Sequence, residues 1–285
     1  MYKEVGISSN NVPITLSIWY TERSCPTIVF LPGTMSHPLM YENFLSGLCE
    51  RGFNIIGVHY LSHGKSPKIK MNYTMEDLLY NVYDATTYGM ENYGDNIAVM
   101  GSSQGGILAA MAAGRDTRLK AVFPHNIMLT TLKETMSLTK YPAWTHRFMG
   151  LIQWGFRVGG KLLPNYKVPG DAYLDYNKVF YSEQAKQDCL NDPRLLPYYP
   201  LRVVASLFNA DLSCLENGSI QCPVILITAK GDPLFSFDYT NKVFDLIHAP
   251  QKELLTLELN RHMIFNEDTD TTINALEPTL HKYLG

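Results

Sequence analysis

The sequence predicts an α/β fold organised around a mostly parallel central sheet flanked by helices. Apolar runs of strand length alternate with helix-length patterns over most of the 285 residues, and such alternation is typical of strand–helix–strand crossovers. The runs Ile97–Met100 and Pro223–Ala229 are continuously apolar, as expected of parallel strands buried on both faces. The first run leads directly into Gly101-Ser102-Ser103-Gln104-Gly105 and a helix rich in small residues.

The elements follow in a regular order. Two segments at 2–8 and 13–20 predict an antiparallel hairpin, because Ile14, Leu16 and Ile18 alternate with polar residues. Parallel strands are predicted near residues 27–31, 54–60, 96–101, 119–123, 223–229 and 253–259. The clearest helical patterns cover residues 75–93, 103–114 and 237–248, with a last helix near 271–283.

The Gly-x-Ser-x-Gly pattern at 101–105 predicts a strained strand-to-helix turn that exposes the Ser103 hydroxyl. Glycines on both sides permit the sharp bend and a close approach of the helix. The pattern alone arises by chance in about one chain in ten of this length. Its ordinary explanation is a turn in which the serine only caps a helix, so further groups are needed to support a catalytic role.

Two such groups follow in the order serine, acid, histidine. Asp232 comes just after the apolar run 223–229, at the strand edge where open α/β sheets place their ligand sites. His262 comes just after the last predicted strand, 253–259. Taken alone, Asp232 is explained as a turn aspartate and His262 as a surface loop histidine. Together with Ser103 they predict a Ser-Asp-His triad, with no metal site.

These features make the chain resemble an α/β-hydrolase-fold serine hydrolase, of the lysophospholipase, monoglyceride lipase and serine aminopeptidase-like group. The resemblance covers the first 126 residues and those after about 217, and it includes the run 27–34 and the loop Leu61-Ser62-His63-Gly64-Lys65-Ser66-Pro67. It implies that the backbone N–H groups of Thr34 and Gln104 form the oxyanion hole. Pro32 and His59 depart from the usual pattern, at positions that do not normally perform chemistry.

The alternation of strand-length and helix-length patterns stops between residues 127 and 216, after the sixth predicted strand. This stretch is rich in aromatic residues and is broken by Gly and Pro. We expect a helical cap, or lid, inserted between two core segments, 1–126 and 217–285. More than half of its aromatic residues are expected simply to pack the cap onto the core. Trp144 and Trp154 are predicted to line an apolar acyl or alkyl pocket.

Composition is that of a globular enzyme. The formal net charge of −3 argues against the basic surface that binds nucleic acid. No apolar run reaches the length of a membrane span. Residues 1–5 lack the pattern of a secretory signal. Five scattered cysteines without Cys-x-x-Cys spacing favour a reducing cytoplasm over a disulfide framework or a zinc site. The oligomeric state is not predicted.

The predicted chemistry is hydrolysis of a small-molecule carboxylic ester through an acyl-enzyme, with no cofactor. Amide, thioester or perhydrolysis on the same triad are alternatives, and so is a non-hydrolysing ligand receptor. Other histidines lack an acid-plus-serine context and are expected to be structural or exposed: His37, His59, His63, His125, His146, His248 and His281. Of these, His37 and His125 lie near strand ends on the side of the expected site.

Overall fold

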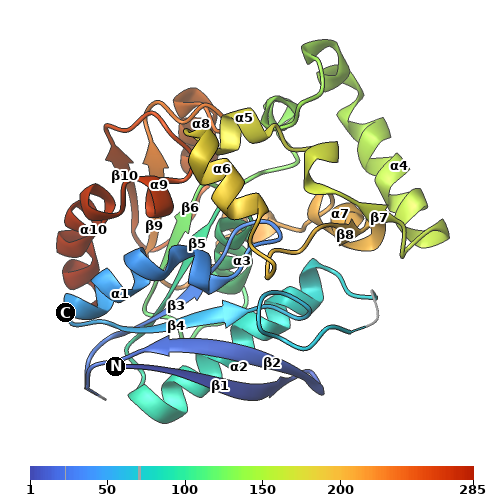
Figure 1. The fold of residues 1–285 in the computed structure, drawn as a ribbon. Helices are drawn as coiled ribbons and strands as arrows, with labels where there is room; N and C mark the ends of the chain where they lie inside the picture. Colours follow the sequence, from blue (N-terminus) through green and yellow to red (C-terminus); the bar gives the residue numbers. More distant parts are fainter. Residues whose placement is uncertain (23, 70–71) are drawn as a thin grey trace.

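A computed structural model describes residues 1–22, 24–69 and 72–285, with the backbone alone at residues 143 and 146. Its centre is an eight-stranded sheet in the order β1-β2-β4-β3-β5-β6-β9-β10. The strands are β1 (Tyr2–Ser9), β2 (Val12–Trp19), β3 (Thr27–Leu31), β4 (Asn54–His59), β5 (Ile97–Ser102), β6 (Ala121–His125), β9 (Val224–Ala229) and β10 (Lys252–Leu257). β1 and β2 are antiparallel, β2 is antiparallel to β4, and every later pairing is parallel. The predicted hairpin and the mostly parallel sheet are confirmed (Figure 1).

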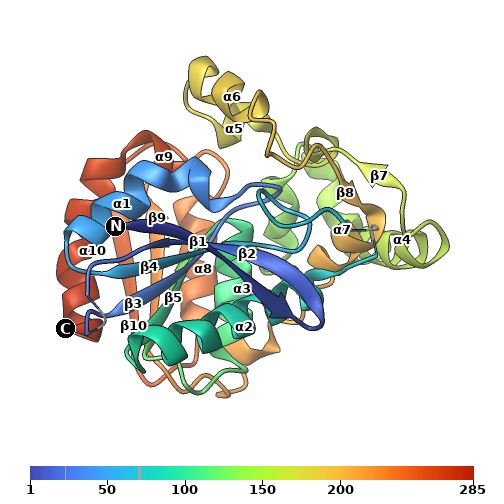
Figure 2. The same cartoon turned by 60° about the horizontal axis from the view of Figure 1, so that its bottom comes forward.

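Side-chain alternation along the central strands separates two hydrophobic layers, one on each face of the sheet. In β3, Val29 and Leu31 belong to one cluster, while Ile28 and Phe30 belong to the other. The first layer contacts α2 (Met75–Tyr93), α3 (Gln104–Ala113) and α8 (Phe237–Leu246), and the second contacts α1 (Glu42–Glu50), α9 (Ile264–Glu267) and α10 (Thr269–Leu284). The helices therefore cover both faces, as Figure 2 shows from below.

Residues between β6 and β9 form a separate group of short elements beyond the carboxyl ends of the strands (Figures 1 and 2). They are the helices α4 (Met149–Leu162), α5 (Tyr176–Val179), α6 (Glu183–Leu190) and α7 (Leu201–Leu207), and the two-residue strands β7 (Lys167–Val168) and β8 (Tyr199–Pro200). Short 3-10 turns connect them: η2 (Lys133–Leu138), η3 (Ala143–Phe148), η4 (Gly170–Ala172) and η5 (Ser213–Leu215), with η1 (Pro38–Tyr41) in the core. We call residues 127–216 the cap.

Several predicted boundaries shift for local reasons. β6 begins at Ala121 and not at the predicted residue 119. The reason is a turn at Asp116, which accepts hydrogen bonds from the backbone N–H groups of Arg118 and Leu119. α3 begins after Ser103, whose backbone is not helical. Within the described residues, no helix is long and apolar enough to cross a membrane.

Candidate active site

Ser103 occupies a strained turn between β5 and α3. Its φ of 52° lies in the left-handed region that a serine rarely adopts. A Cβ placed on Gly101 would lie 2.0 Å from the Gly105 carbonyl oxygen, and one on Gly105 would lie 2.1 Å from the Leu31 carbonyl oxygen. Only glycine fits at either position, so the two glycines of the motif permit the tight packing that holds Ser103 at the carboxyl edge of the sheet.

Two backbone amides are free beside Ser103. Neither the Thr34 nor the Gln104 N–H donates a hydrogen bond to another described residue, yet Thr34, Ser103 and Gln104 line one cavity. The loop carrying Thr34 is fixed on both sides of it. Gly33 N–H donates to the Tyr41 hydroxyl at 3.2 Å, and Met35 N–H donates to the Tyr199 hydroxyl at 3.0 Å. Free amides on a fixed loop are suited to receive an oxyanion.

Asp232 and His262 form a buried pair. His262 Nδ1 lies 2.9 Å from Asp232 Oδ2, and both side chains are almost inaccessible to solvent. Asp232 Oδ2 also accepts from Asn126 Nδ2 at 2.9 Å, and its Oδ1 accepts from the backbone N–H groups of Leu234 and Phe235 at 2.8 and 2.9 Å. Burial by itself would raise the pKa of Asp232, but the neighbouring His262 and these donors outweigh it and lower that pKa. The carboxylate is therefore held ionised and oriented.

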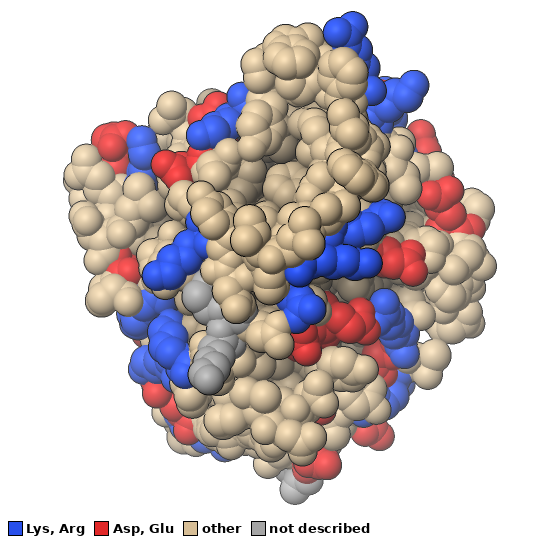
Figure 3. Space-filling model, turned by 90° about the vertical axis from the view of Figure 1, so that its right-hand side faces the viewer, with Lys and Arg blue, Asp and Glu red and all other residues tan. Residues whose placement is uncertain are grey.

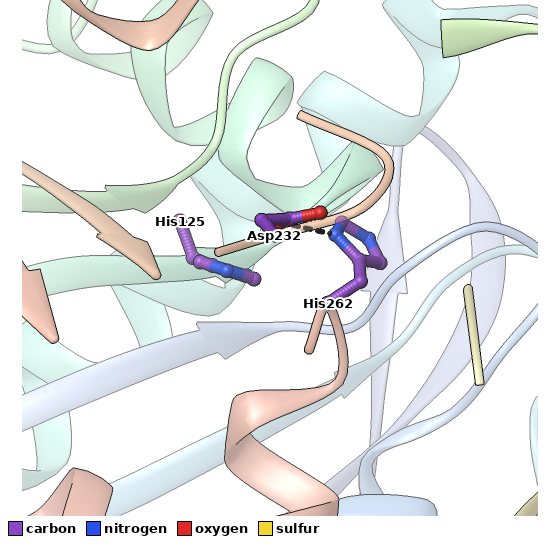
Figure 4. A group of neighbouring side chains, drawn as sticks. All are labelled: His125, Asp232 and His262. Carbon is purple, nitrogen blue, oxygen red and sulfur yellow. Dashed lines mark hydrogen bonds and ion pairs between the residues drawn. The ribbon is translucent and has the colours of Figure 1, made fainter. Parts of the chain in front are cut away.

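A second histidine lies beside this pair. Figure 4 shows His125, Asp232 and His262 in one group, and the ring centroids of the two histidines are 5.4 Å apart. Asn126 Nδ2 lies 3.1 Å from His125 Nε2, so one amide group donates to both Asp232 and His125. Burial lowers the pKa of His125 to about 3, and this histidine is neutral at physiological pH.

The side chains of His125, Asp232 and His262 offer ligand atoms within 4.8 Å of one another. A metal would need a lone pair of the carboxylate. Asp232 already accepts four hydrogen bonds, two on each oxygen, which is the full capacity of a carboxylate. No lone pair of Asp232 is left for a metal ion, so this group of side chains does not fit a metal site.

Ser103 stands where two chambers of one cavity meet. Both chambers are lined by Thr34, Ser103, Leu174 and Leu234. The first chamber also includes His262, Met263, Tyr41, Val179, Phe180, Cys189 and Leu190. The second includes Gln104, Ile107, Met128, Leu138, Tyr173, Leu207, Phe208 and Phe235. No Asp, Glu, Lys or Arg is among the described residues that line either chamber.

The prediction for the two tryptophans is wrong. Trp144 and Trp154 are 64% and 58% exposed, and neither lines a chamber. Both belong to the outer side of the cap, Trp144 in η3 and Trp154 in α4. Aromatic residues of the cap that do face the cavity include Tyr173, Phe180 and Phe208. Composition identified an aromatic cap, but it could not tell the inner face from the outer one.

The cap also supplies a residue that sequence reasoning missed. Tyr199 is fully buried, and its hydroxyl contacts three core segments. It accepts from Met35 N–H at 3.0 Å and from Gln104 Nε2 at 3.1 Å, and it lies 2.9 Å from His63 Nε2. His63 Nδ1 lies 2.9 Å from the Leu61 carbonyl oxygen and must donate to it, so Tyr199 donates to His63 Nε2. One hydroxyl thus ties together both segments that carry the free amides.

The remaining histidines are placed as follows. His59 and His63 are buried and hydrogen-bonded within the core, His37 is buried beside Asp192, and His248 and His281 are exposed. The side chain of His146 lies outside the described part of the chain.

The doubly wound sheet, the strained serine turn and the buried Asp232–His262 pair together define an α/β-hydrolase. A family model described as "Serine aminopeptidase, S33" matches residues 22–269. The chain belongs to this family of α/β-hydrolases. No curated protein sequence matches the chain.

Solved structures of hydrolases share the fold across nearly the whole chain. A monoacylglycerol lipase of Paleococcus ferrophilus is 18% identical with a TM-score of 0.77, and the match covers 95% of this chain and 99% of that one. A soluble variant of the monoglyceride lipase of Saccharomyces cerevisiae is 15% identical with a TM-score of 0.77, covering 99% and 95%. A thermophilic esterase of Thermogutta terrifontis is 16% identical with a TM-score of 0.67, covering 99% and 100%.

Proposed function

We propose that the protein hydrolyses a small carboxylic ester with an apolar acyl group, using Ser103, His262 and Asp232. The observation that carries the proposal is the cavity in which Ser103, His262 and the free amides of Thr34 and Gln104 meet. His262 takes the Ser103 proton as the hydroxyl oxygen attacks the ester carbonyl, and Asp232 stabilises the imidazolium that forms. The two amides hold the oxyanion, each contributing roughly 3–4 kcal/mol.

The position of His262 orients the substrate. The histidine must pass its proton to the departing alcohol, and it lines the first chamber only. The alcohol therefore lies in the first chamber and the acyl chain in the second, among Ile107, Met128 and Leu207. Water then enters on the alcohol side, is deprotonated by His262, and releases the carboxylic acid from Ser103.

Amide cleavage at a free amino terminus is the alternative that the family description raises. A protonated amine in a buried site requires an anionic partner, and no carboxylate lines either chamber among the described residues. The neighbouring structures named as lipases and esterases support the ester reaction. We also propose that residues 127–216 act as the lid, since Leu138, Tyr173 and Phe208 line the acyl chamber.

The five cysteines are free thiols. A reducing compartment such as the cytoplasm is therefore the proposed place of action.

The deciding experiment compares p-nitrophenyl esters from acetyl to decanoyl with aminoacyl p-nitroanilides. We expect ester turnover that rises with acyl length, and labelling of the protein by a fluorophosphonate. Ser103→Ala should abolish both, whereas the matched Ser102→Ala variant should retain both, because Ser102 is buried in β5. Faster turnover of the nitroanilides, or labelling that survives Ser103→Ala, would refute the proposal.

A further inference from the structure

Exposed apolar side chains gather on the outer side of the cap, on and around α4. We call the following residues the cap patch: Tyr141, Trp144, Phe148, Leu151, Trp154, Leu162, Leu163 and Tyr166. Each is a large side chain at least a third exposed. A gathering of exposed apolar side chains on a single copy of a chain marks an interaction surface.

The same stretch carries cations and no acids. No Asp or Glu occurs between Glu134 and Asp171, although the whole chain has a formal charge of −3. Five cations fall in this interval: Lys140, Arg147, Arg157, Lys161 and Lys167. Among the described residues, no carboxylate lies within ion-pair distance of any of the five. The stretch that carries the cap patch therefore holds five cations that lack an ion-pair partner among the described residues.

Figure 3 presents the side of the molecule on which α4 lies in Figure 1. Uncharged side chains form its upper lobe, and Lys and Arg side chains border that lobe. Arg147 shows how the two kinds of residue combine, because its guanidinium lies 4.7 Å from the centre of the Phe148 ring. A flexible cation beside an exposed aromatic ring is typical of segments that lie in the interface of a bilayer.

We propose that the cap patch docks on the surface of an anionic lipid membrane. Trp144, Leu151 and Trp154 would enter the boundary between headgroups and acyl chains, and the five cations would contact lipid phosphates. A second copy of this chain fits less well, because a two-fold contact would set the cationic stretch against itself. The patch begins close to the proposed acyl chamber: Leu138 lines that chamber, and Tyr141 is already exposed.

The test measures sedimentation of the protein with vesicles and requires no turnover, so its result is separate from that of the proposed ester hydrolysis. Two vesicle compositions are used: phosphatidylcholine alone, and phosphatidylcholine with a third of it replaced by phosphatidylglycerol. We expect the partition coefficient to be about 10-fold higher or more on the anionic vesicles, since each cation near an anionic surface adds to the binding.

Two double variants separate the contributions. Leu151→Ser with Trp154→Ser should lower partitioning to both vesicles by about 100-fold or more, because two large apolar side chains no longer enter the bilayer. Arg147→Glu with Lys161→Glu should remove the preference for phosphatidylglycerol. The matched control is Tyr80→Ser with Lys120→Glu, which changes an exposed tyrosine of α2 and an exposed lysine just before β6, both outside the cap. This variant should leave partitioning unchanged.

Tryptophan emission gives an independent readout. The chain has three tryptophans, and Trp19 is buried in the core. Brominated acyl chains in the vesicles should therefore quench Trp144 and Trp154 and leave Trp19 emission intact. Equal partitioning of the parent and the Leu151/Trp154 variant would overturn the proposal. So would oligomers in sedimentation velocity that the same variant abolishes, because the patch would then be covered by another copy of the chain.

Discussion

Asn126 donates a hydrogen bond from Nδ2 to Asp232 Oδ2, the same oxygen that faces His262 Nδ1. Asn126 directly follows β6 and has a φ of 61°, a conformation that asparagine tolerates better than most residues. The neighbouring strand therefore contributes a donor that holds the acid in place. Asn126 is a positioning residue for the proposed triad, since it acts on the histidine through Asp232.

Removal of this donor should slow catalysis. In Asn126→Gly the backbone keeps its left-handed conformation, and the lost hydrogen bond to a charged group costs about 1.5–3 kcal/mol, or about 10- to 100-fold in kcat/KM. Asn11→Gly is the matched control, because Asn11 has a φ of 63° in the β1–β2 turn, far from the site. A kcat/KM for Asn126→Gly equal to that of the control would contradict the positioning role.

Asp232→Asn should reduce kcat by a factor on the order of 10⁴, because the amide cannot stabilise the imidazolium and favours the wrong tautomer. Asp238→Asn is the control in the same turn-and-helix region, and Asp211→Asn is the control in the cap. Both side chains are exposed, so both variants should keep the parent activity. Single-turnover kinetics with a p-nitrophenyl ester measures the effect, and a large loss in either control with none in Asp232→Asn would move the acid elsewhere.

Tyr199→Phe should lower kcat about 10-fold while changing KM little. The variant leaves Met35 N–H and Gln104 Nε2 without their acceptor. The loop of Thr34 thus loses one of its two anchors, and the unpaired groups cost about 1–3 kcal/mol. Tyr239→Phe is the chemically matched control. The buried Tyr239 hydroxyl is hydrogen-bonded to Leu129 N–H and to Thr135 Oγ1, and it does not contact the segments that carry the free amides. Equal kcat values in the two variants would show that Tyr199 only stabilises the fold.

The assignment of the chambers predicts two opposite effects. Met128→Trp narrows the second chamber and should depress kcat/KM for decanoyl relative to acetyl esters of one alcohol. Val179→Trp narrows the first chamber and should depress kcat/KM for long relative to short alcohols of one acid. Each excluded methylene is worth about 0.8 kcal/mol, a few-fold in kcat/KM. If the two variants exchanged their effects, the orientation of the substrate would be reversed; Trp154→Ala should alter neither profile.

Folding stability should fall steeply in mild acid. Burial lowers the pKa of His37 and His63 to about 4 and that of His59 and His125 to about 3, from an ordinary value of 6.5. Between these limits the unfolded chain binds protons that the folded chain does not, so stability is lost as pH falls below 6.5.

The slope of the free energy of unfolding against pH should approach about 5 kcal/mol per pH unit near pH 5, or roughly 1.4 for each histidine. Guanidinium unfolding at pH 7.5, 6 and 5 measures it. His37→Gln should reduce the proton uptake on unfolding by about one, and the exposed His248→Gln should leave it unchanged. A stability independent of pH over this range would show that these histidines accept protons in the folded state.

The parts of the fold that sequence predicted depend on local signals. The apolar run 223–229 and the glycines around Ser103 act over a few residues, and their consequences, β9 and the strained turn, are confirmed by the structure. The order of the residues along the chain, and their positions just after two strands, also predicted that Asp232 and His262 meet, and the structure places them in contact. The catalytic roles of these residues stay predictions until the variants are measured.

What sequence could not predict depends on contacts between distant segments. The hydroxyl of Tyr199 meets Gln104 from 95 positions away and Met35 from 164, and no periodicity encodes such a pairing. Asn126 reaches Asp232 over 106 positions. Trp144 and Trp154 were assigned to the wrong side of the cap for the same reason, since packing between distant segments, such as α4 against α7, decides which side faces the cavity.

The bonds of Tyr199 restrict how a substrate can reach Ser103. A cap that moved away as one rigid body would break the three hydrogen bonds of the Tyr199 hydroxyl. It would leave the buried His63 Nε2 without its partner. In contrast, α5 and α6 bury none of their residues, although Val179, Phe180, Cys189 and Leu190 wall the first chamber. Segments with few buried contacts open at the lowest free energy. For the proposed ester hydrolysis we therefore expect the substrate to reach Ser103 past α5 and α6, because opening there leaves the hydrogen bonds of Tyr199 to Met35 and Gln104 intact.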